Sequence, residues 1–401
     1  MDSGIIINPK DFQNNKPLGI YLHIPFCQTK CFYCDFNTYS KIEDQIDDYI
    51  SSIISEINIW GKILGKLSIT SIFFGGGTPS YIESKYIKII IDSICENFYV
   101  DKKIEITLET NPNDVNKNKF IDLLNIGINR ISMGVQSFDD NLLKLLGRRH
   151  DSEEAENSYK TLREIGYSNL SIDLMYGLPY QTIESWENTL EKSLYLDPSH
   201  ISMYSLQVEN GTPLKSKINS GIYEKPDDDL AAEMYEKAEK NLFEKNFFQY
   251  EISNWSKKSF ECIHNKIYWE NKFYLGIGAG AHSHINNFRF SNIKSPKTYT
   301  NSLVDHRSSK SKIMKMNFIE NLESLSYSDE ISETMMMGMR LNQGISLKKF
   351  EMQFGKTIKE IFNNEIKKLQ KLNLIELSDT HIKLSSNGRL LGNEVFQEFI
   401  I

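Results

Sequence analysis

The sequence lacks the features that would place the protein in a membrane, outside the cell or on nucleic acid. No run approaches the roughly 18 apolar residues of a membrane span, since residues 86–91 are interrupted by Lys88 and followed by Asp92. The N-terminus has an acidic second residue and a three-residue apolar run, which is not typical of a secretory signal. The net charge of -7 leaves no basic excess for nucleic acid. We expect a cytoplasmic protein without a nucleic-acid partner, whose association with membranes, if any, runs through other proteins.

Cysteine is scarce as well, with five residues in 401. An odd number without a targeting signal argues against a disulfide framework and favours a reducing compartment. Cys95 and Cys262 stand alone, whereas Cys27, Cys31 and Cys34 share one short loop after the apolar run 19–24. The C-x3-C-x2-C spacing brings three thiolates together, one fewer than a closed iron–sulfur cluster or a structural zinc site needs.

Three interpretations of this loop are open. The thiols could bind an iron–sulfur cluster whose fourth ligand comes from elsewhere, or bind zinc with an open position and His23 nearby. They could also be buried as small apolar side chains. Aromatic residues in and around the loop, Phe26, Phe32 and Tyr33, predict a shielded site and favour the cluster.

Strand and helix patterns alternate after the cysteine loop. Buried strands are predicted to end near residues 24, 74, 110, 134, 174 and 204, and helices are predicted over 44–59, 84–98, 115–126, from about 141, and around Trp186. This alternation predicts an α/β fold with parallel strands and right-handed crossovers. We expect a partial (β/α)6 barrel of the TIM type.

The length predicts two or three domains. We divide the chain into an N-terminal extension (1–17), the barrel core (18–215), a barrel-completing region (216–325) and a C-terminal module (326–401). In that module helices are predicted over 328–341, 347–354 and 358–372, before a hairpin over 374–384, a pattern typical of a winged helix. Its lysines alternate with Glu360, Glu365 and Glu376, so we expect protein docking, dimerisation or support of the barrel in place of DNA binding. A homodimer is left open.

Polar residues and glycines follow the predicted strand ends, where parallel barrels place their chemistry. Each has an ordinary explanation. The glycines of GGGTPS (75–80) could form a tight turn, Glu109 or Asp173 could cap a helix, Gln136 could satisfy a loop, and Arg148 could be a solvated surface charge. The glycine run lacks the lysine of a phosphate loop. Convergence of these residues on one face beside the cysteine loop favours a shared site.

Taken together, the motifs resemble those of the radical S-adenosylmethionine (SAM) superfamily. The branch is the one that holds oxygen-independent coproporphyrinogen III oxidase and the HemW-type heme chaperones. The resemblance begins with YLHIPFC (21–27), Cys31, Tyr33 and Cys34. It extends through GGGTP (75–79), SMGVQS (132–137), LGR (146–148), DLMYGLP (173–179) and YEISN (250–254).

The resemblance implies that Cys27, Cys31 and Cys34 hold a [4Fe–4S] cluster and that SAM takes its fourth position. Glu109 and Asp173 then suit hydroxyl or ammonium groups of SAM, and Arg148 suits a carboxylate. A reductant such as flavodoxin or ferredoxin is implied, while productive cleavage of SAM is left open. The residues implied to line the SAM sites are Tyr21, Tyr33, Gly76, Gly77, Thr78, Glu109, Gln136, Arg148 and Asp173.

Two functions compete within this branch. The oxidase pattern has a further cysteine where this chain has Phe36, and a longer segment ahead of its cluster than the 26 residues here. Both departures match the HemW type, as does HNKIYW (264–269), which resembles a heme-chaperone signature. His264 is therefore a candidate axial heme ligand, although a hydrogen-bonded core histidine is the ordinary alternative.

We therefore expect a chaperone that binds heme as cargo and delivers it to heme-dependent, respiratory acceptor proteins. The first alternative is oxidative decarboxylation of coproporphyrinogen III in porphyrin biosynthesis. The second is a radical SAM reaction on another substrate.

Overall fold

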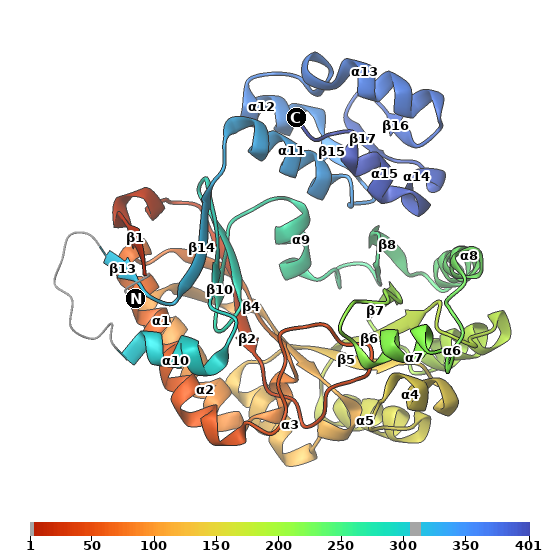
Figure 1. Cartoon of the computed structure of the whole chain (residues 1–401), viewed down its shortest axis with the longest axis horizontal. Helices are drawn as coiled ribbons and strands as arrows, with labels where there is room; N and C mark the ends of the chain where they lie inside the picture. Colours follow the sequence, from red (N-terminus) through yellow and green to blue (C-terminus); the bar gives the residue numbers. More distant parts are fainter. Residues whose placement is uncertain (1–3, 305–313) are drawn as a thin grey trace.

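The computed structural model describes residues 4–304 and 314–401, and its centre is one large curved sheet (Figure 1). The strand order is β14-β12-β11-β10-β2-β3-β4-β5-β6-β7-β9-β8, and the seven strands from β10 to β7 in this order are parallel. The predicted α/β fold with a partial barrel is confirmed. The parallel strands are β2 (Leu18–Ile24), β3 (Ser68–Gly76), β4 (Tyr99–Thr110), β5 (Arg130–Gln136), β6 (Asn169–Tyr176), β7 (His200–Ser205) and β10 (Tyr274–Ile277).

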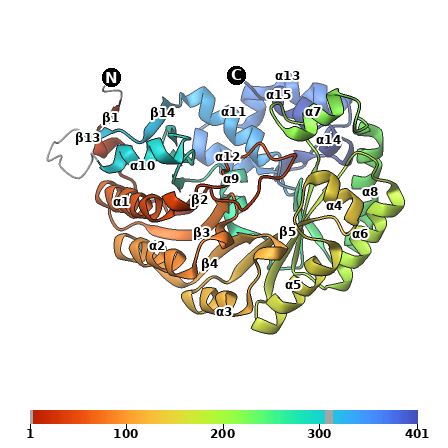
Figure 2. The same cartoon turned by 60° about the horizontal axis from the view of Figure 1, so that its bottom comes forward.

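Helices lie along the outside of the curved sheet (Figure 2). They are α1 (Ile46–Leu64), α2 (Ser84–Asn97), α3 (Lys117–Ile126), α4 (Asp140–Leu146), α5 (Ser152–Ile165) and α6 (Ile183–Tyr195). The helix predicted from about residue 141 is confirmed as α4, which begins at Asp140, but a second helix that was not predicted, α5, follows it before β6. Gly147, with φ of 72°, ends α4 in the left-handed region, and Asp151 begins α5 with a capping box. The break between them carries Arg148.

Both edges of the sheet are extended by antiparallel strands, so within the described residues it ends at β14 and β8 without closing. One edge has β11 (His282–Ile285), β12 (Phe288–Asn292) and β14 (Ile319–Ser324), and the other has β9 (Asn254–Ser256) and β8 (Phe248–Glu251). A separate pair joins β1 (Ile5–Ile7) to β13 (Met314–Met316). The remaining helices of this part are α7 (Pro213–Asn219), α8 (Asp228–Glu244), α9 (Ile263–Trp269) and α10 (Pro296–Val304).

The C-terminal module has its own apolar core, which includes Phe350, Phe362 and Ile382. It contains α11 (Tyr327–Gly338), α12 (Leu347–Phe354), α13 (Ile358–Lys371) and the predicted hairpin, formed by β16 (Ile375–Leu377) and β17 (His381–Leu384). A short β15 (Ile345–Ser346) completes a three-stranded sheet, and α14 (Ser386–Leu390) and α15 (Gly392–Gln397) follow. Figure 1 shows α9 between this module and the barrel. None of the helices described is long and apolar enough to cross a membrane.

Candidate functional site

A cavity of about 640 Å³ opens at the carboxyl ends of the parallel strands and reaches into the barrel. Its wall contains every residue that the sequence nominates for the cluster, for SAM or for heme. The structure thus brings together residues from five strands (β2 to β6), the cysteine loop, the turn after α4 and α9, while their ligand roles stay predictions. The nominated residues in the wall are Tyr21, Cys27, Cys31, Tyr33, Cys34, Gly76, Gly77, Thr78, Glu109, Gln136, Arg148, Asp173 and His264.

Backbone hydrogen bonds of Phe32 anchor the cysteine loop to the end of α4 and to α7. Phe32 N donates to Leu146 O at 2.9 Å, and Leu214 N donates to Phe32 O at 2.9 Å. The three thiols are half-buried at the cavity wall. Burial raises the pKa of Cys27 to about 11 and also raises the pKa of Cys34. Thiols in this environment ionise readily only when a cationic group such as iron binds them.

The arrangement fits a cluster better than a single zinc ion. In the part of the chain that the structure describes, no three His, Cys, Asp or Glu side chains are grouped to hold one metal ion. The three thiolates of a [4Fe–4S] cluster bind different irons and therefore stand further apart. His23 is also committed elsewhere, since its Nδ1 lies 3.1 Å from Tyr21 Oη and its Nε2 lies 3.0 Å from Asn37 O.

The glycine run packs its backbone directly on the start of the cysteine loop. Gly77 N donates to Ile24 O at 2.8 Å, and Thr78 N donates to Phe26 O at 2.9 Å. A Cβ on Gly77 would lie 2.8 Å from Phe26 O and 2.9 Å from Ile24 O. Gly76 has φ of 106°, in the left-handed region that favours glycine. The chain therefore turns where β3 ends, at Gly76 and Gly77, and both glycines also line the cavity.

Arg148 lies in the cavity wall, so the interpretation as a solvated surface charge is wrong. Its Nη2 donates to Asn111 Oδ1 at 2.5 Å and to Gly134 O, and its Nη1 lies 3.4 Å from Cys31 Sγ. The turn at Gly147 directs the side chain inward after α4. These contacts hold the guanidinium beside the cysteine loop without a carboxylate partner, which suits an incoming carboxylate.

Two carboxyl groups face the cavity, Glu109 from β4 and Asp173 from β6, the strands on either side of β5. Asp173 accepts hydrogen bonds from Ser132 Oγ at 2.9 and 3.0 Å and from Ser171 Oγ at 2.9 Å. Burial, assisted by the charge of Asp173, raises the pKa of Glu109 to about 8. Glu109 is therefore mostly protonated at neutral pH. Both residues lie within strands, so neither is a helix cap.

Gln136 ends β5 with φ of 69°. A residue other than glycine in this region carries about 1 kcal/mol of backbone strain. The strained backbone places the Gln136 side chain in the cavity wall near Gly134.

His264 projects from α9 and is 1% exposed. Its Nδ1 lies 2.8 Å from Ser71 Oγ, and its Nε2 lies 2.8 Å from Tyr268 Oη. Burial lowers the pKa of this imidazole to about 3, so the ring is neutral. Because both nitrogens have protein partners, iron ligation requires one of these bonds to break. Its role as an axial ligand stays a prediction.

Sequence reasoning missed Arg130, which lies in the cavity wall at the start of β5. Strand alternation could have found it, because residues 130, 132, 134 and 136 share one face of a strand. It also missed Tyr268 and Asn265 of α9 and Tyr204 at the end of β7, all in the same wall.

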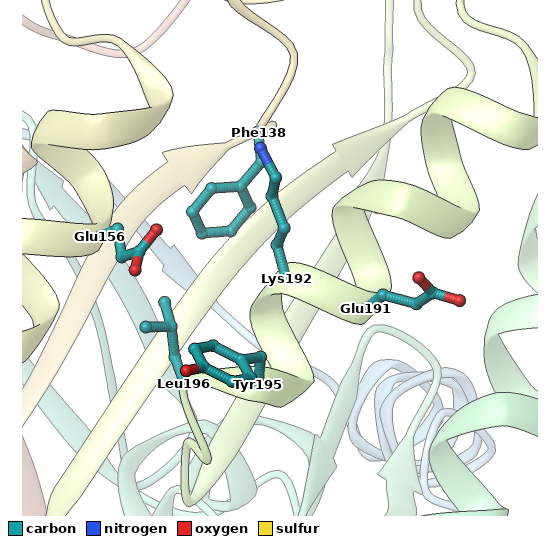
Figure 3. Close-up of a pocket in the computed structure, with 6 residues that line it drawn as sticks. All are labelled: Phe138, Glu156, Glu191, Lys192, Tyr195 and Leu196. Carbon is teal, nitrogen blue, oxygen red and sulfur yellow. The ribbon is translucent and has the colours of Figure 1, made fainter.

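A smaller hollow of about 300 Å³ lies beside α5 and α6 and contains none of the nominated residues (Figure 3). The large cavity is therefore the candidate site.

Two family-wide sequence patterns match this chain. The one described as Radical SAM superfamily matches residues 21–192, and the one described as HemN C-terminal domain matches residues 325–391. The first range covers most of β2, the cysteine loop and β3 to β6, and the second covers most of the C-terminal module.

Relatives and a solved structure extend the similarity to nearly the whole chain. The heme chaperone HemW of Bacillus subtilis is 36% identical over 382 residues, which cover 95% of this chain and 98% of that protein. The heme chaperone HemW of Lactococcus lactis is 34% identical over 386 residues, covering 96% and 98%. The structure of coproporphyrinogen III oxidase (HemN) from Escherichia coli superposes with a TM-score of 0.83 at 24% identity, covering 96% of this chain and 90% of that one. At 24% identity, this superposition shows that the two proteins share a fold, and it shows no more than that.

Proposed function

Because the chain belongs to the HemW family of the radical SAM superfamily, we propose that it is a heme chaperone that delivers heme to heme-dependent acceptor proteins. The observation that carries the proposal is the match to two HemW proteins along 98% of their length. Phe36, where the oxidase pattern has a further cysteine, supports the same choice. Respiratory proteins are the proposed acceptors, and the cytoplasm is the proposed location.

The cavity supplies the groups that this role needs at its cysteine end. Cys27, Cys31 and Cys34 hold the cluster. When bound, a [4Fe–4S] cluster supplies a one-electron centre at which SAM can be reduced. Arg148, steadied by Asn111 and Gly134, pairs with the carboxylate of SAM. The other residues proposed to bind SAM are Tyr21, Tyr33, Gly76, Gly77, Thr78, Glu109, Gln136 and Asp173.

The turn at Gly76 and Gly77 leaves room for SAM because it presents backbone and no side chain. Glu109 and Asp173 accept hydrogen bonds from its hydroxyl or ammonium groups. Asn37 steadies the far side of the cysteine loop, since its Nδ2 donates to Ala279 O at 3.0 Å and to Lys294 O at 2.9 Å. The loop is thus tied to the segment after β10, more than 240 residues away. An external reductant such as flavodoxin or ferredoxin supplies electrons.

The decisive experiment compares heme transfer with porphyrin chemistry. The purified protein is loaded with cluster under anaerobic conditions and titrated with heme, and the change in Soret absorbance is followed. We expect saturable binding, followed by transfer to a heme-depleted acceptor cytochrome. Conversion of coproporphyrinogen III propionates to vinyl groups at a sustained rate would replace the proposal with the oxidase function.

The same titration with His264→Ala tests the axial ligand. An altered Soret band would support His264 as the ligand, and an unchanged band would exclude it.

A further inference from the structure

Arg130 is a buried charge for which the described residues provide no hydrogen-bond acceptor. The residue is 2% exposed, and its guanidinium lies in the cavity wall. Its Nε is enclosed without a partner, and no side-chain hydrogen bond or ion pair joins it to a residue of the described chain. Buried arginines are normally paired, because an enclosed charge without a partner costs several kcal/mol.

The nearby carboxylates are already occupied by other donors. The Glu105 carboxylate accepts from the backbone N–H groups of Ile263 at 3.0 Å and His264 at 3.1 Å, at the start of α9. Asp173 accepts from two serines. These acids partly balance the charge of Arg130, but they leave its N–H groups without acceptors. An acceptor from outside the chain would complete the site.

Four rings line the same cavity on the side of α9. Tyr21 and Phe73 stack at 6.2 Å with 27° between their planes, and Phe73 and His264 stack at 5.1 Å with 28°. Tyr268 meets His264 edge-on at 5.1 Å. Since the nitrogens of His264 are bonded to Ser71 and Tyr268, this ring is held in place as a surface. Tyr21 and His264 also lie 6.4 Å apart with 32° between their planes, so three near-parallel rings form a cluster with Tyr268 edge-on beside it. Such an aromatic surface favours a flat aromatic ligand.

The two arginines of the cavity lie toward different ends of it. Arg130 begins β5, whereas Gln136 ends β5 next to the cysteine loop and Arg148. The Arg148 guanidinium donates to Gly134 O, and four residues of strand separate the backbones of Arg130 and Gly134 by about 13 Å. A ligand group paired with Arg130 therefore occupies a different part of the cavity from one paired with Arg148.

We propose that Arg130 and the ring wall of Tyr21, Phe73, His264 and Tyr268 form a second compartment that binds a planar aromatic carboxylate of the porphyrin class. One propionate group of the ligand pairs with the Arg130 guanidinium, and the ring system lies against the wall. The inference rests on the proposed function for the identity of the ligand. It adds the binding place and the group that recognises the propionate.

The test compares iron protoporphyrin IX with its dimethyl ester, in which both propionates are masked. Optical titrations use the full-length, cluster-loaded protein as wild type, as Arg130→Gln and as the control Arg163→Gln, whose side chain is exposed on α5. A charge-assisted hydrogen-bonded pair is worth about 1.5–3 kcal/mol, or about a 10- to 100-fold preference for the free acid. We expect this preference in wild type and R163Q and its loss in R130Q.

The outcomes separate the two proposals. A preference that persists unchanged in R130Q, or its absence in a wild-type protein that binds both porphyrins, overturns the inference and leaves the chaperone function standing. Wild-type protein that binds neither porphyrin rejects the chaperone function and the inference together. If R130Q does not fold, as judged by circular dichroism and iron content, Arg130→Lys and Arg130→Met take its place. A preference that Arg130→Lys keeps would agree with pairing through its ammonium group. The preference should be lost in Arg130→Met, which keeps the length of the side chain without the charge, and a preference in R130M equal to that of wild type would overturn the inference.

Discussion

The two ends of the cavity bond a buried guanidinium to different extents, although the Nε atoms of both Arg148 and Arg130 lack a partner among the described residues. At the cysteine end Arg148 donates to Asn111 Oδ1 and Gly134 O and lies against Cys31 Sγ. At the α9 end Arg130 has no acceptor among the described residues. The protein alone therefore orients Arg148, whereas Arg130 needs an external group to complete its bonding. The first end is preorganised, and the second is sensitive to what occupies it.

The ends also differ in how they are held. The cysteine end is built from strand ends and one loop, while α9 contacts the C-terminal module. Arg289 forms a bidentate ion pair with Glu333 of α11 at 2.5 and 2.7 Å, and its Nη1 donates to Tyr274 Oη at 3.1 Å. The Tyr274 ring meets Tyr268 edge-on at 4.6 Å. Two elements distant in sequence thus support the wall that carries His264.

Removing a thiol should have the largest effect and should act at the cysteine end. We expect Cys31→Ala to lose nearly all bound iron and sulfide after reconstitution, because two remaining thiolates cannot hold the cluster. Iron and sulfide assays with the visible absorption spectrum measure this. The control is Cys95→Ala, an exposed cysteine on α2, which should retain full loading. Full loading of C31A would remove the loop from the cluster site.

Adding a side chain at Gly77 should have the next largest effect. In Gly77→Ala the new methyl group meets two backbone oxygens, which cannot move aside as a flexible side chain can. We expect a loss of about 1–3 kcal/mol in the free energy of unfolding, together with poor retention of the cluster. Gly355→Ala is the control, because its Cβ meets nothing within 4 Å and only its φ of 67° is strained. It should lose about 1 kcal/mol and keep its cluster, and equal cluster loss in both variants would contradict the prediction.

The pH dependence of SAM binding should report on Glu109. Its pKa of about 8 means that an ammonium donor of SAM, or a hydroxyl that pairs with the ionised carboxylate, binds with release of a proton. Proton release makes binding tighten as pH rises, with Kd falling up to about tenfold per pH unit below pH 8. Equilibrium dialysis between pH 6.5 and 7.5 measures this slope. Glu109→Gln should lose it, except for the part due to the amino group of SAM itself, and an equal slope in both proteins would show that Glu109 does not titrate on binding.

Weakening the contact with the C-terminal module should have the smallest effect and should act only at the α9 end. In Glu333→Gln the bidentate ion pair with Arg289, whose side chains are 23% and 22% exposed, loses its charge, which is worth about 1 kcal/mol. We expect heme affinity to fall by at most about fivefold, with iron content and SAM affinity unchanged. Glu320→Gln, exposed on β14, is the control. A change in SAM affinity would show that the two ends are not independent.

Much of the fold could be predicted because it follows from local patterns. Alternation of strands and helices marked the parallel core, and the helix over 347–354 and the hairpin near 378–380 were placed correctly. The break at Gly147 was missed, although the glycine and the polar residues after it, with Asp151 as a helix cap, mark the end of one helix and the start of another. The antiparallel edge strands and α9 were not assigned, since short strands and a seven-residue helix depend on the sheet edges and on the Glu105 carboxylate that receive them.

By itself, the sequence determined the cysteine loop, the order of the strand ends and the family, because spacing along the chain and the parallel register are enough to bring those residues to one face. Only the tertiary structure decided which charges there are satisfied. Whether a guanidinium is bonded depends on which nearby acceptors are free, and Glu105 is engaged by α9, more than 150 residues away in the chain. No local pattern carries that information. Strand alternation could place Arg130 on the cavity face, but its lack of an acceptor became visible only once the barrel and α9 had been brought together.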